Sequence, residues 1–478
     1  MSSIRQGDHL PKKTSLKPFF DPKTVAIIGA SREPHKLGNI IFTNFINSGF
    51  KGKVYPINPK ADEIADAKCY PNIKAVPESI DLAVVAVPAE VVPQVMRECV
   101  AEDVKAAIII SGGFGESGPD GKKREDELQR IIKDSDIRVM GPNCIGIWDG
   151  HTKVDTLFFP PDRLNRPREG SISFISQSGA SGAAVLDWAA AQGIGMNKFV
   201  SYGNMIDVNE IDLLEYLKDD PMTSVIMMYL EQTADGRRLM EVAKRITPKK
   251  PIIALKAGST EAGARAALSH TGALAGSDQV YDAAFKQSGI VRAYSFDELL
   301  DRAFALALQP PAKGDRIAII TNGGGLGVML ADDITHQKIN VAKFNPETTN
   351  ALRQKFPARV SIGNPIDLTG DANEDSYETA LNLVLADPNV DGAVVIILFQ
   401  LQTIEEGIVD VIAKANKKYE KPITVCAFGG GFAKKCAKKL QFEKIPCYPT
   451  PDRAAEAMMG LVTYGRKQQD NPNPKFLL

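Results

Sequence analysis

The chain has 478 residues, and the usual length of a domain predicts about three domains, each large enough to bury its own core. Its apolar fraction of 44%, charged fraction of 24% and net charge of −1 are typical of a soluble globular protein. These values exclude a strongly basic surface of the kind that binds polyanions. We therefore expect no nucleic acid among its partners.

The six cysteines form no Cys-x-x-Cys pair and no His/Cys cluster with metal spacing, which predicts reduced thiols and no protein-bound metal. The first twenty residues contain no apolar signal core. No window reaches the ~20 apolar residues that span a bilayer. Together these features favour a cytoplasmic protein that does not bind membranes.

The first predicted element is a β-branched strand from Val25 to Ile28, which runs into Gly29, Ala30 and Ser31 before a helical pattern. Such a turn presents unpaired backbone N–H groups and the positive end of a helix dipole, which suits a phosphate or pyrophosphate. The alternative is a tight turn in which glycine only lets the helix and the strand pack closely.

The second strand ends at Asn58, where a dinucleotide fold would carry an acidic residue for the ribose diol. The G-x-G-x-x-G spacing is also missing, which makes a dehydrogenase the weakest interpretation. Asn58 with Lys60 instead suits a phosphorylated ribose or another anion. The next two strands end in small residues at Pro88 and at Ser111 and Gly112, which predicts a thin pocket for an extended ligand.

Two later strands, 172–176 and 317–321, end in glycine-rich turns of the same kind and begin an internal repeat. Each copy continues through a Gly-Asn pair, a helix, an Asp-Pro pair, a strand, and a Lys-Pro pair that opens another strand. The repeat predicts helices at 210–217 and near 377–385, strands at 224–230 and 393–398, and further strands after Lys250-Pro251 and Lys421-Pro422.

Strands that alternate with helices over short loops predict parallel sheets with helices on both faces and ligands at the carboxyl ends of the strands. Proline pairs place linkers at 149–169 and 309–315. We therefore predict an α/β protein with one Rossmann-like and two flavodoxin-like domains. The predicted boundaries are 1–18 for an N-terminal arm, 19–150, 151–310 and 311–465 for the domains, and 466–478 for a tail or linker.

A lone histidine stands among small residues at 269–276, which read Ser-His-Thr-Gly-Ala-Leu-Ala-Gly, in a chain with five histidines. No bulky neighbour surrounds His270, which suits close contact between its imidazole and a phosphate or another reactive group. The alternative is a polar turn between two helices with a solvated histidine.

Five motifs together resemble the α subunit of the ADP-forming acyl-CoA synthetases, the acetate–CoA ligases related to succinyl-CoA synthetase. They are Val-Ala-Ile-Ile-Gly-Ala-Ser at 25–31, Gly-Pro-Asn-Cys-Ile-Gly at 141–146, Ser-Gln-Ser-Gly at 176–179, Ser-His-Thr-Gly at 269–272 and Asn-Pro-Ile-Asp-Leu-Thr at 364–369. The resemblance covers residues 19–465. It implies a CoA-binding domain followed by two succinyl-CoA-synthetase-like domains, the first of which carries a phosphohistidine segment.

The resemblance implies that His270 is transiently phosphorylated and that Glu231 orients it. The alternative for Glu231 is an ordinary polar residue at the end of a strand. Two helix N-termini would face the phosphoryl group, and they consist of Gln177, Ser178, Gly179 and Ala180, and of Asn322, Gly323, Gly324 and Gly325. The expected CoA and substrate residues are Gly29, Ser31, Arg32, Lys36, Asn58, Lys60, Pro88, Ser111, Gly112, Asn143 and Cys144. Among these, Arg32 and Lys36 are the best candidates for the CoA phosphates.

By the same resemblance, Asn143 and Cys144 border the thioester end of CoA. Cys144 is better explained as a small packing residue than as a nucleophile, since no histidine neighbours it in the sequence.

The sequence contains no G-x-x-x-x-G-K-[ST] motif and no stretch resembling an ATP-grasp domain. We therefore expect ADP or ATP and Mg²⁺ to be bound mainly by a separate ATP-grasp β subunit or by fused C-terminal domains, in a hetero-oligomer. The implied reaction is acyl-CoA + phosphate + ADP = carboxylic acid + CoA + ATP, with a small acid such as acetate. The alternatives are a CoA-dependent acyltransferase and a regulatory CoA-binding protein.

Overall fold

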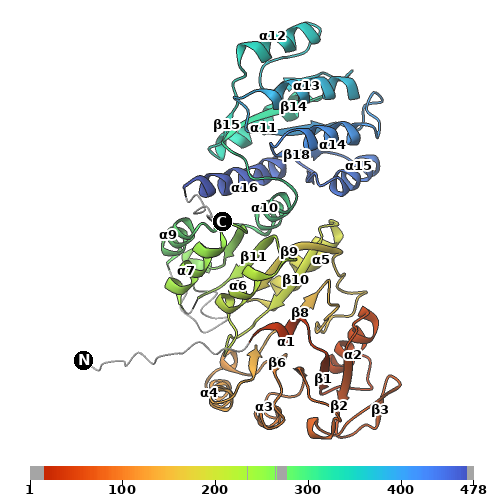
Figure 1. The fold of residues 1–478 in the computed structure, drawn as a ribbon, viewed down its shortest axis with the longest axis vertical. Coiled ribbons are helices and arrows are strands. Elements are labelled where there is room, and N and C mark those ends of the chain that lie inside the picture. The colour runs from red at the N-terminus through yellow and green to blue at the C-terminus, as the bar shows by residue number, and fades with distance from the viewer. Residues whose placement is uncertain (1–14, 234, 264, 266–276, 471–478) are drawn as a thin grey trace, which may run out of the picture. The chain divides into compact units, whose positions relative to one another are not determined.

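The computed structural model describes residues 15–233, 235–263, 265 and 277–470, and Figure 1 shows its helices and strands. The chain divides into two compact units. The first consists of residues 1–223, 228–239 and 256–278, and the second of residues 224–227, 240–255 and 279–478.

The first sheet has five parallel strands in the order β2-β1-β5-β6-β7. They are β1 (Thr24–Ile28), β2 (Lys53–Ile57), β5 (Leu82–Val85), β6 (Ala106–Ile109) and β7 (Arg138–Met140). Every residue of β1, β5 and β6 is buried, as expected for a parallel sheet with both faces covered.

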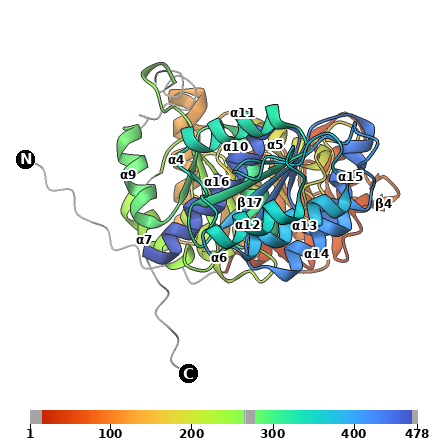
Figure 2. The ribbon, with the colours of Figure 1, turned by 90° about the horizontal axis from the view of Figure 1, so that it is seen from above.

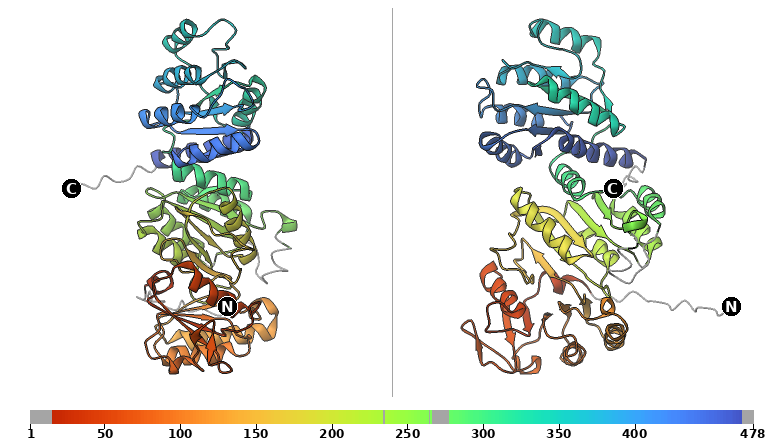
Figure 3. Two further views of the ribbon diagram at one scale, coloured as in Figure 1. Left: turned by 90° about the vertical axis from the view of Figure 1, so that its right-hand side faces the viewer. Right: turned by 180° about the vertical axis from the view of Figure 1, so that it is seen from behind.

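Helices cover both faces of this sheet. Figure 3 shows α2 (Leu37–Ser48, red) on one side, and α3 (Val92–Ala101) and α4 (Pro119–Lys133), both orange, on the other. The smaller elements are α1 (Lys17–Phe20), the hairpin of β3 (Glu63–Ile64) and β4 (Ala67–Lys68), and the 3-10 helices η1 (Ile73–Ala75) and η2 (Gly115–Ser117).

The second sheet has six strands in the order β13-β12-β11-β9-β10-β8. They are β8 (Gly146–Asp149), β9 (Glu169–Ser176), β10 (Met196–Ser201), β11 (Val225–Leu230), β12 (Ile252–Lys256) and β13 (Val291–Ala293). Strand β8 precedes the domain boundary predicted at residue 150, yet it pairs antiparallel with β10 of the second sheet. The accompanying helices are α5 (Gly179–Ala191), α6 (Glu210–Asp219), α7 (Gly236–Ile246), α9 (Asp278–Ser288) and α10 (Phe296–Leu308).

The third sheet runs in the order β15-β14-β17-β18-β19, and β16 pairs with β14 beside it. Its strands are β14 (Arg316–Thr321), β15 (Asn340–Val341), β16 (Ile366–Asp367), β17 (Gly392–Ile397), β18 (Ile423–Ala427) and β19 (Cys447–Tyr448). Its helices are α11 (Gly324–His336), α12 (Pro346–Lys355), α13 (Glu374–Ala386), α14 (Ile408–Lys418), α15 (Gly431–Phe442) and α16 (Pro451–Asp470). Figure 2 shows α11 on one side of β17, and α13 and α14 on the other.

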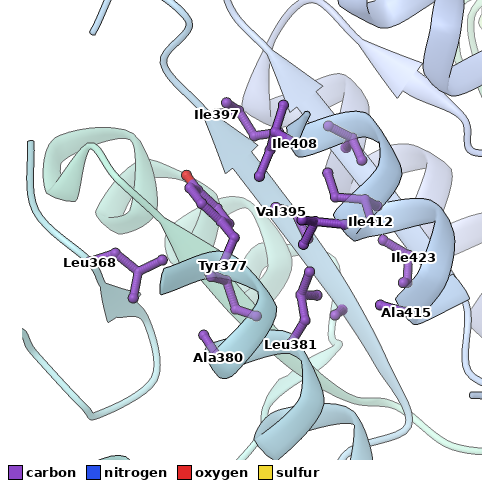
Figure 4. Packing of buried hydrophobic residues seen from close by; sticks show 14 of the residues in the cluster. Leu368, Tyr377, Ala380, Leu381, Val395, Ile397, Ile408, Ile412, Ala415 and Ile423 are labelled. Atoms are coloured by element: carbon purple, nitrogen blue, oxygen red, sulfur yellow. The ribbon is translucent and has the colours of Figure 1, made fainter. Parts of the chain in front are cut away.

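Figure 4 shows how two of these helices build the core of the third domain. Tyr377 and Leu381 on α13 and Ile412 on α14 belong to one buried cluster with Val395 on β17. The phenol of Tyr377 is fully buried, and its hydroxyl donates to the backbone oxygen of Ile396 at 2.8 Å. The helical spacing of the apolar residues therefore places them against the sheet.

All three sheets share one strand order. When β8 and β16 are left out and the strands are numbered along the chain, each sheet reads 2-1-3-4-5, the order found in flavodoxin. Ligands in such folds bind at the carboxyl ends of the strands, where the winding direction reverses between strands 1 and 3. The predicted doubly wound α/β architecture is confirmed. The topology also extends to the first domain a repeat that the sequence revealed only in the other two.

The secondary structure predicted from the repeat is confirmed as well. The strands expected at 224–230 and 393–398 are β11 and β17, and the helices expected at 210–217 and near 377–385 fall within α6 and α13. Strands β12 and β18 follow the two Lys-Pro pairs.

The first predicted linker is a packed segment. The amide of Asn44 on α2 donates to the backbone oxygen of Leu157 at 2.6 Å, and Arg166 pairs with the buried Asp155 at 2.8 Å. Residues 150–168 thus connect two sheets while they contribute buried side chains of their own.

Candidate functional site

The carboxyl ends of the strands of the first sheet form the rim where the CoA residues were predicted. Gly29 follows β1 with φ +93°, and a side chain there would collide with the backbone oxygen of Ala86. Gly38 in the first turn of α2 is equally crowded, because a Cβ there would collide with the backbone oxygen of Gly29. Close packing alone therefore requires glycine at both positions.

Asn58, at the end of β2, uses its side chain to hold this turn. Its Nδ2 donates to the backbone oxygen of Ala30 at 2.7 Å, and its Oδ1 accepts from the backbone N–H of Lys60 at 2.9 Å. Both ends of the amide are thus engaged within the protein, which indicates that Asn58 shapes the rim.

Two cations, Arg32 and Lys36, lie beside the same turn. Arg32 is exposed, and its guanidinium lies 3.5 Å from the backbone oxygen of Lys60. Lys36, at the N-cap of α2, is also exposed, and its ammonium group lies 3.8 Å from the carboxylate of Glu33. The exposed Lys36–Glu33 ion pair and the long Arg32 contact are both weak, so both cations remain available to an anionic ligand.

The ends of β5, β6 and β7 continue the rim. The hydroxyl of Ser111 donates to the backbone oxygen of Val87, next to Pro88. Gly112 is exposed, and a Cβ there would lie 3.3 Å from Oδ1 of Asn143. The backbone N–H of Asn143 donates to the backbone oxygen of Ser111 at 2.9 Å, which joins the loops after β6 and β7.

Cys144 is buried, and its Sγ lies 3.4 Å from the backbone oxygen of Ile109. Burial raises the pKa of the Cys144 thiol to about 12. The thiol is therefore protonated at neutral pH, which agrees with a packing residue.

The N-terminus of α5 forms the first of the two predicted phosphate turns. Ser178 is the N-cap residue, and its hydroxyl accepts from the backbone N–H of Ser181. Ser178 and Gly179 are partly exposed and Ala180 is exposed, so the first N–H groups of the helix can be reached by an anion. Gly179 also has a packing role, because a Cβ there would lie 2.7 Å from Ile145.

Gln177 and Glu231 meet at the ends of β9 and β11. The side-chain oxygen of Gln177 accepts from the backbone N–H groups of Glu231 at 2.9 Å and of Gln232 at 3.0 Å. Through these two hydrogen bonds Gln177 fixes the backbone that carries the predicted orienting glutamate, a role that the sequence did not indicate.

The charge of Glu231 also acts on its neighbour Tyr229. Burial raises the pKa of Tyr229, and the Glu231 carboxylate raises that pKa further.

The turn before α11 repeats this arrangement in the third domain. The Asn322 oxygen accepts from the backbone N–H of Leu398, after β17, at 2.8 Å. Gly323 is the N-cap residue, and Gly325 has open space around the position of a side chain. A Cβ on Gly324 would collide with Oδ2 of Asp367, so a carboxylate lies beside this helix N-terminus.

His270 lies outside the described residues, as does the whole stretch 266–276. The structure does bring together the predicted CoA residues around the first sheet, and Gln177 with Glu231 at the second. Asn322–Gly325 belongs to the other compact unit.

Sequence reasoning missed the side chains that support the rim. Glu116, Glu125 and Asn204 form a hydrogen-bonded cluster beneath Asn143, with Asn204 donating to both carboxylates at 2.6 and 2.9 Å. Asn204 belongs to the Gly-Asn pair that marked the internal repeat. The recurrence of this pair could have singled out Asn204, but it carried no information about the residues to which Asn204 is hydrogen-bonded.

Within the described ranges, no group of three or more His, Cys, Asp and Glu side chains is placed to hold a metal ion. None of the helices searched in those same ranges has the length and apolarity needed to cross a membrane.

Three family models match the chain in succession. A CoA binding domain matches residues 23–149, a succinyl-CoA ligase like flavodoxin domain matches residues 169–306, and a Ligase-CoA domain matches residues 317–468.

Relatives of known activity align over nearly the whole chain. The α subunit of acetate–CoA ligase [ADP-forming] I from Pyrococcus furiosus is 42% identical over 95% of this chain and 98% of its own length. Acetate–CoA ligase [ADP-forming] I from Archaeoglobus fulgidus is 40% identical over 94% of this chain, which corresponds to 64% of that longer protein. Relatives thus occur both as α subunits and as longer single chains.

A solved structure agrees with these alignments. The dinucleotide-forming acetyl-coenzyme A synthetase 1 of Ca. Korarchaeum cryptofilum, in complex with phosphate and ADP, superimposes with a TM-score of 0.88. It is 40% identical, and the match covers 95% of this chain and 98% of that one.

Proposed function

Because the chain belongs to the family of ADP-forming acetate–CoA ligase α subunits, we propose that it supplies the CoA site and the phosphohistidine of an ADP-forming acyl-CoA synthetase. The proposed overall reaction is acyl-CoA + phosphate + ADP = carboxylic acid + CoA + ATP. Acetate is the first acid to test, because the relatives above are acetate–CoA ligases.

The reaction proceeds in three transfers. Phosphate attacks the thioester carbonyl, the C–S bond breaks, and the thiolate leaves to become the CoA thiol while an acyl phosphate forms. A neutral nitrogen of His270 then attacks phosphorus, and the carboxylate leaves. The phosphoryl group finally passes from His270 to the terminal oxygen of ADP, which yields ATP.

In this proposal the first domain binds CoA along its rim. The exposed cations Arg32 and Lys36 attract the CoA phosphates beside the turn after β1. The pantetheine arm then runs past Pro88 and Gly112 to the end of β7. Neighbouring strands lie about 4.8 Å apart, so β1 and β7, three strands apart in the sheet, suit the ends of an extended ligand.

The second domain handles the phosphoryl group. The N-terminus of α5 offers N–H groups and a positive dipole end to the phosphoryl oxygens. Glu231 orients the imidazole and keeps one nitrogen as a donor, so the other remains a nucleophile. The observation that carries this assignment is the pair of hydrogen bonds from Glu231 and Gln232 to Gln177, which ties the glutamate to the residue preceding the α5 turn.

The nucleotide and Mg²⁺ would be bound by a partner with ATP-grasp domains, either as a β subunit or as a fused segment. The existence of longer single-chain relatives supports this division of labour. The Asn322–Gly325 turn is proposed as the second helix N-terminus that meets the phosphoryl group, with Asp367 limiting how much negative charge that turn accepts.

The test is to incubate the chain alone with acetyl phosphate labelled at phosphorus and to look for an acid-labile, base-stable adduct. We expect the adduct on the wild type and on His336→Ala, which removes an exposed histidine of α11, and no adduct on His270→Ala. Glu231→Gln should label more slowly.

Two outcomes would contradict the proposal. The first is an unlabelled wild type even when CoA, Mg²⁺ and an ATP-grasp partner are supplied. The second is equal labelling of wild type and His270→Ala. Acyl transfer to or from CoA without nucleotide or phosphate would favour the acyltransferase instead.

A further inference from the structure

The side chain of Asn204, in the loop after β10, has one possible orientation. Its Nδ2 donates to Oε2 of Glu116 at 2.6 Å and to Oε2 of Glu125 at 2.9 Å, and its Oδ1 accepts from Nδ2 of Asn143 at 3.3 Å. A flipped amide would place its oxygen against two carboxylates, which only accept hydrogen bonds when ionised. The two acidic side chains therefore determine which atom Asn204 presents to Asn143.

The carboxylates are themselves fixed by backbone N–H groups. Glu116 accepts from Gly113 at 2.6 Å and from Phe114 at 3.1 Å, while Glu125 accepts from Gly115 at 3.1 Å. Burial raises the pKa of Glu116, but hydrogen bonds from Asn204, Gly113 and Phe114 outweigh it and lower the pKa below its ordinary value of 4.5. Glu116 is thus ionised at neutral pH, and the loop after β6 is tied to Asn204.

The backbone of the Asn204 loop is equally close to Asn143. The N–H of Asn204 donates to the oxygen of Pro142 at 3.0 Å. Gly203 has φ +59°, and a Cβ there would lie 2.7 Å from the Asn143 oxygen. The loops after β7 and β10 are therefore joined through both backbone and side-chain contacts.

Asn143 is exposed at the end of β7 with φ +58°, and Asn204 occupies its amide donor. Its Oδ1 faces Gly112, 3.3 Å from where a side chain on that glycine would begin. The rim therefore presents a hydrogen-bond acceptor at this point.

Building on the CoA site proposed above, we propose that Asn204 is a positioning residue: it orients the Asn143 amide so that Oδ1 accepts a hydrogen bond from the donor end of the pantetheine arm. Glu116 and Glu125 act through Asn204, and none of the three touches CoA.

The experiment measures binding of two probes to the full chain by calorimetry. CoA reports the whole site, and adenosine 3′,5′-bisphosphate reports only the nucleotide end. In Asn204→Asp, a third carboxylate faces Glu116 and Glu125, and the loop separates from Asn143. We expect CoA to bind about tenfold more weakly, while the nucleotide probe changes by less than about twofold.

A second variant tests the orientation itself. Combining Asn204→Asp with Glu116→Gln exchanges donor and acceptor at one contact and preserves the charge of the cluster, while the carboxylate of Glu125 still faces the carboxylate introduced at position 204. The double variant should therefore restore part of the CoA affinity that Asn204→Asp loses. Asn345→Asp is the matched control, because Asn345 caps α12 and aspartate caps a helix equally well.

Each outcome decides one question. A wild type that binds neither probe refutes the proposed CoA site. If the wild type binds both probes, three results overturn the role of Asn204. Asn204→Asp could bind CoA as tightly as the wild type does, it could lose the same affinity for both probes, or Glu116→Gln could fail to restore any of its CoA affinity. Should Asn204→Asp fail to fold, Glu116→Gln alone sets a donor against the Asn204 donor. Glu116→Gln must then weaken the binding of CoA without weakening the binding of adenosine 3′,5′-bisphosphate, or the proposal fails.

Discussion

At the scale of single residues, several amide side chains hold the backbone of the protein itself. Gln177, Asn322 and Asn58 were each predicted to contact a ligand. The side-chain oxygens of Gln177 and Asn322 accept from the backbone of another loop, whereas Asn58 reaches another loop through its Nδ2, which donates to Ala30. Gln177 and Asn322 occupy equivalent places after the first strand of two repeated domains. In both domains this amide therefore holds the end of the third strand, β11 or β17, next to the N-terminus of a helix.

Replacing Gln177 with leucine removes the acceptor for the N–H groups of Glu231 and Gln232. Leaving a buried N–H without a partner costs about 1–3 kcal/mol, so we expect a lower unfolding free energy and about tenfold slower formation of the phosphohistidine. Gln309→Leu is the matched control, because Gln309 is a buried amide bonded to Ile423 and Lys444 in the other compact unit. Equal rates of labelling in both variants would show that Gln177 only stabilises the fold.

Cys144 should be chemically silent despite its place beside Asn143. With a pKa of about 12, roughly one thiol in ten thousand is ionised at pH 8. We expect no alkylation of Cys144 by iodoacetamide in the native chain and full alkylation in urea, read by mass spectrometry of the peptide. Cys144→Ala should retain CoA binding. Rapid native alkylation would instead make Cys144 a candidate nucleophile.

At the scale of elements, the contact between the loops after β7 and β10 depends on a glycine. In Gly203→Ala a methyl group meets the backbone oxygens of Pro142 and Asn143 in a left-handed conformation with φ +59°. Gly49→Ala carries the same backbone strain, with φ +85°, but nothing lies within 4 Å of its added Cβ. We expect Gly49→Ala to cost about 1–2 kcal/mol of unfolding free energy, and Gly203→Ala to cost more and to weaken CoA binding. Equal losses in the two variants would show that the loops separate freely.

The sequence predicts the elements that are determined by their own residues better than those that are determined by contacts with distant parts of the chain. Strands such as β11 and β17 are continuous apolar runs buried on both faces, so composition alone identifies them. Strand β8 has four residues, and its pairing with β10 is decided by tertiary contacts, which is why it was assigned to the first domain. The cluster around Asn204 joins residues 61 to 88 positions apart, a distance at which spacing patterns carry no signal.

At the scale of the whole molecule, ion pairs with one buried partner make the stability of each compact unit depend on pH. In the first unit, Asp220 pairs with the buried Lys198 at 3.0 Å. Burial raises the pKa of Asp220, but hydrogen bonds from Thr223, Lys198 and Asn197 outweigh it and lower the pKa. In the second unit, Arg316 has the same effect on Asp391. A lowered carboxyl pKa means that the unfolded chain binds protons more readily than the folded one, so acid favours unfolding.

Asp391 allows the sign of this effect to be tested. Its Oδ2 accepts from the backbone N–H of Arg316 at 3.0 Å and from Nε at 2.8 Å, and its Oδ1 accepts from Nη2 at 2.8 Å. Burial raises its pKa, and the Arg316 hydrogen bonds reverse this and hold the pKa below the ordinary 3.8. The stabilisation is therefore complete at pH values above 3.8 and is lost as the pH falls through the lower folded value.

We expect Asp391→Asn to lower the unfolding free energy of the second unit by about 1.5–3 kcal/mol at pH 7, the range for hydrogen bonds to a charged group. The difference from wild type should shrink as the pH falls below 4, because the carboxyl is protonated first in the unfolded chain and then, at its lower pKa, in the folded chain, where it resembles the amide. Calorimetric melting at several pH values measures this, with Asp332→Asn on the exposed face of α11 as the control. A difference between wild type and Asp391→Asn that persists unchanged in acid would mean that Asp391 stabilises the fold through its shape, with no contribution from its charge.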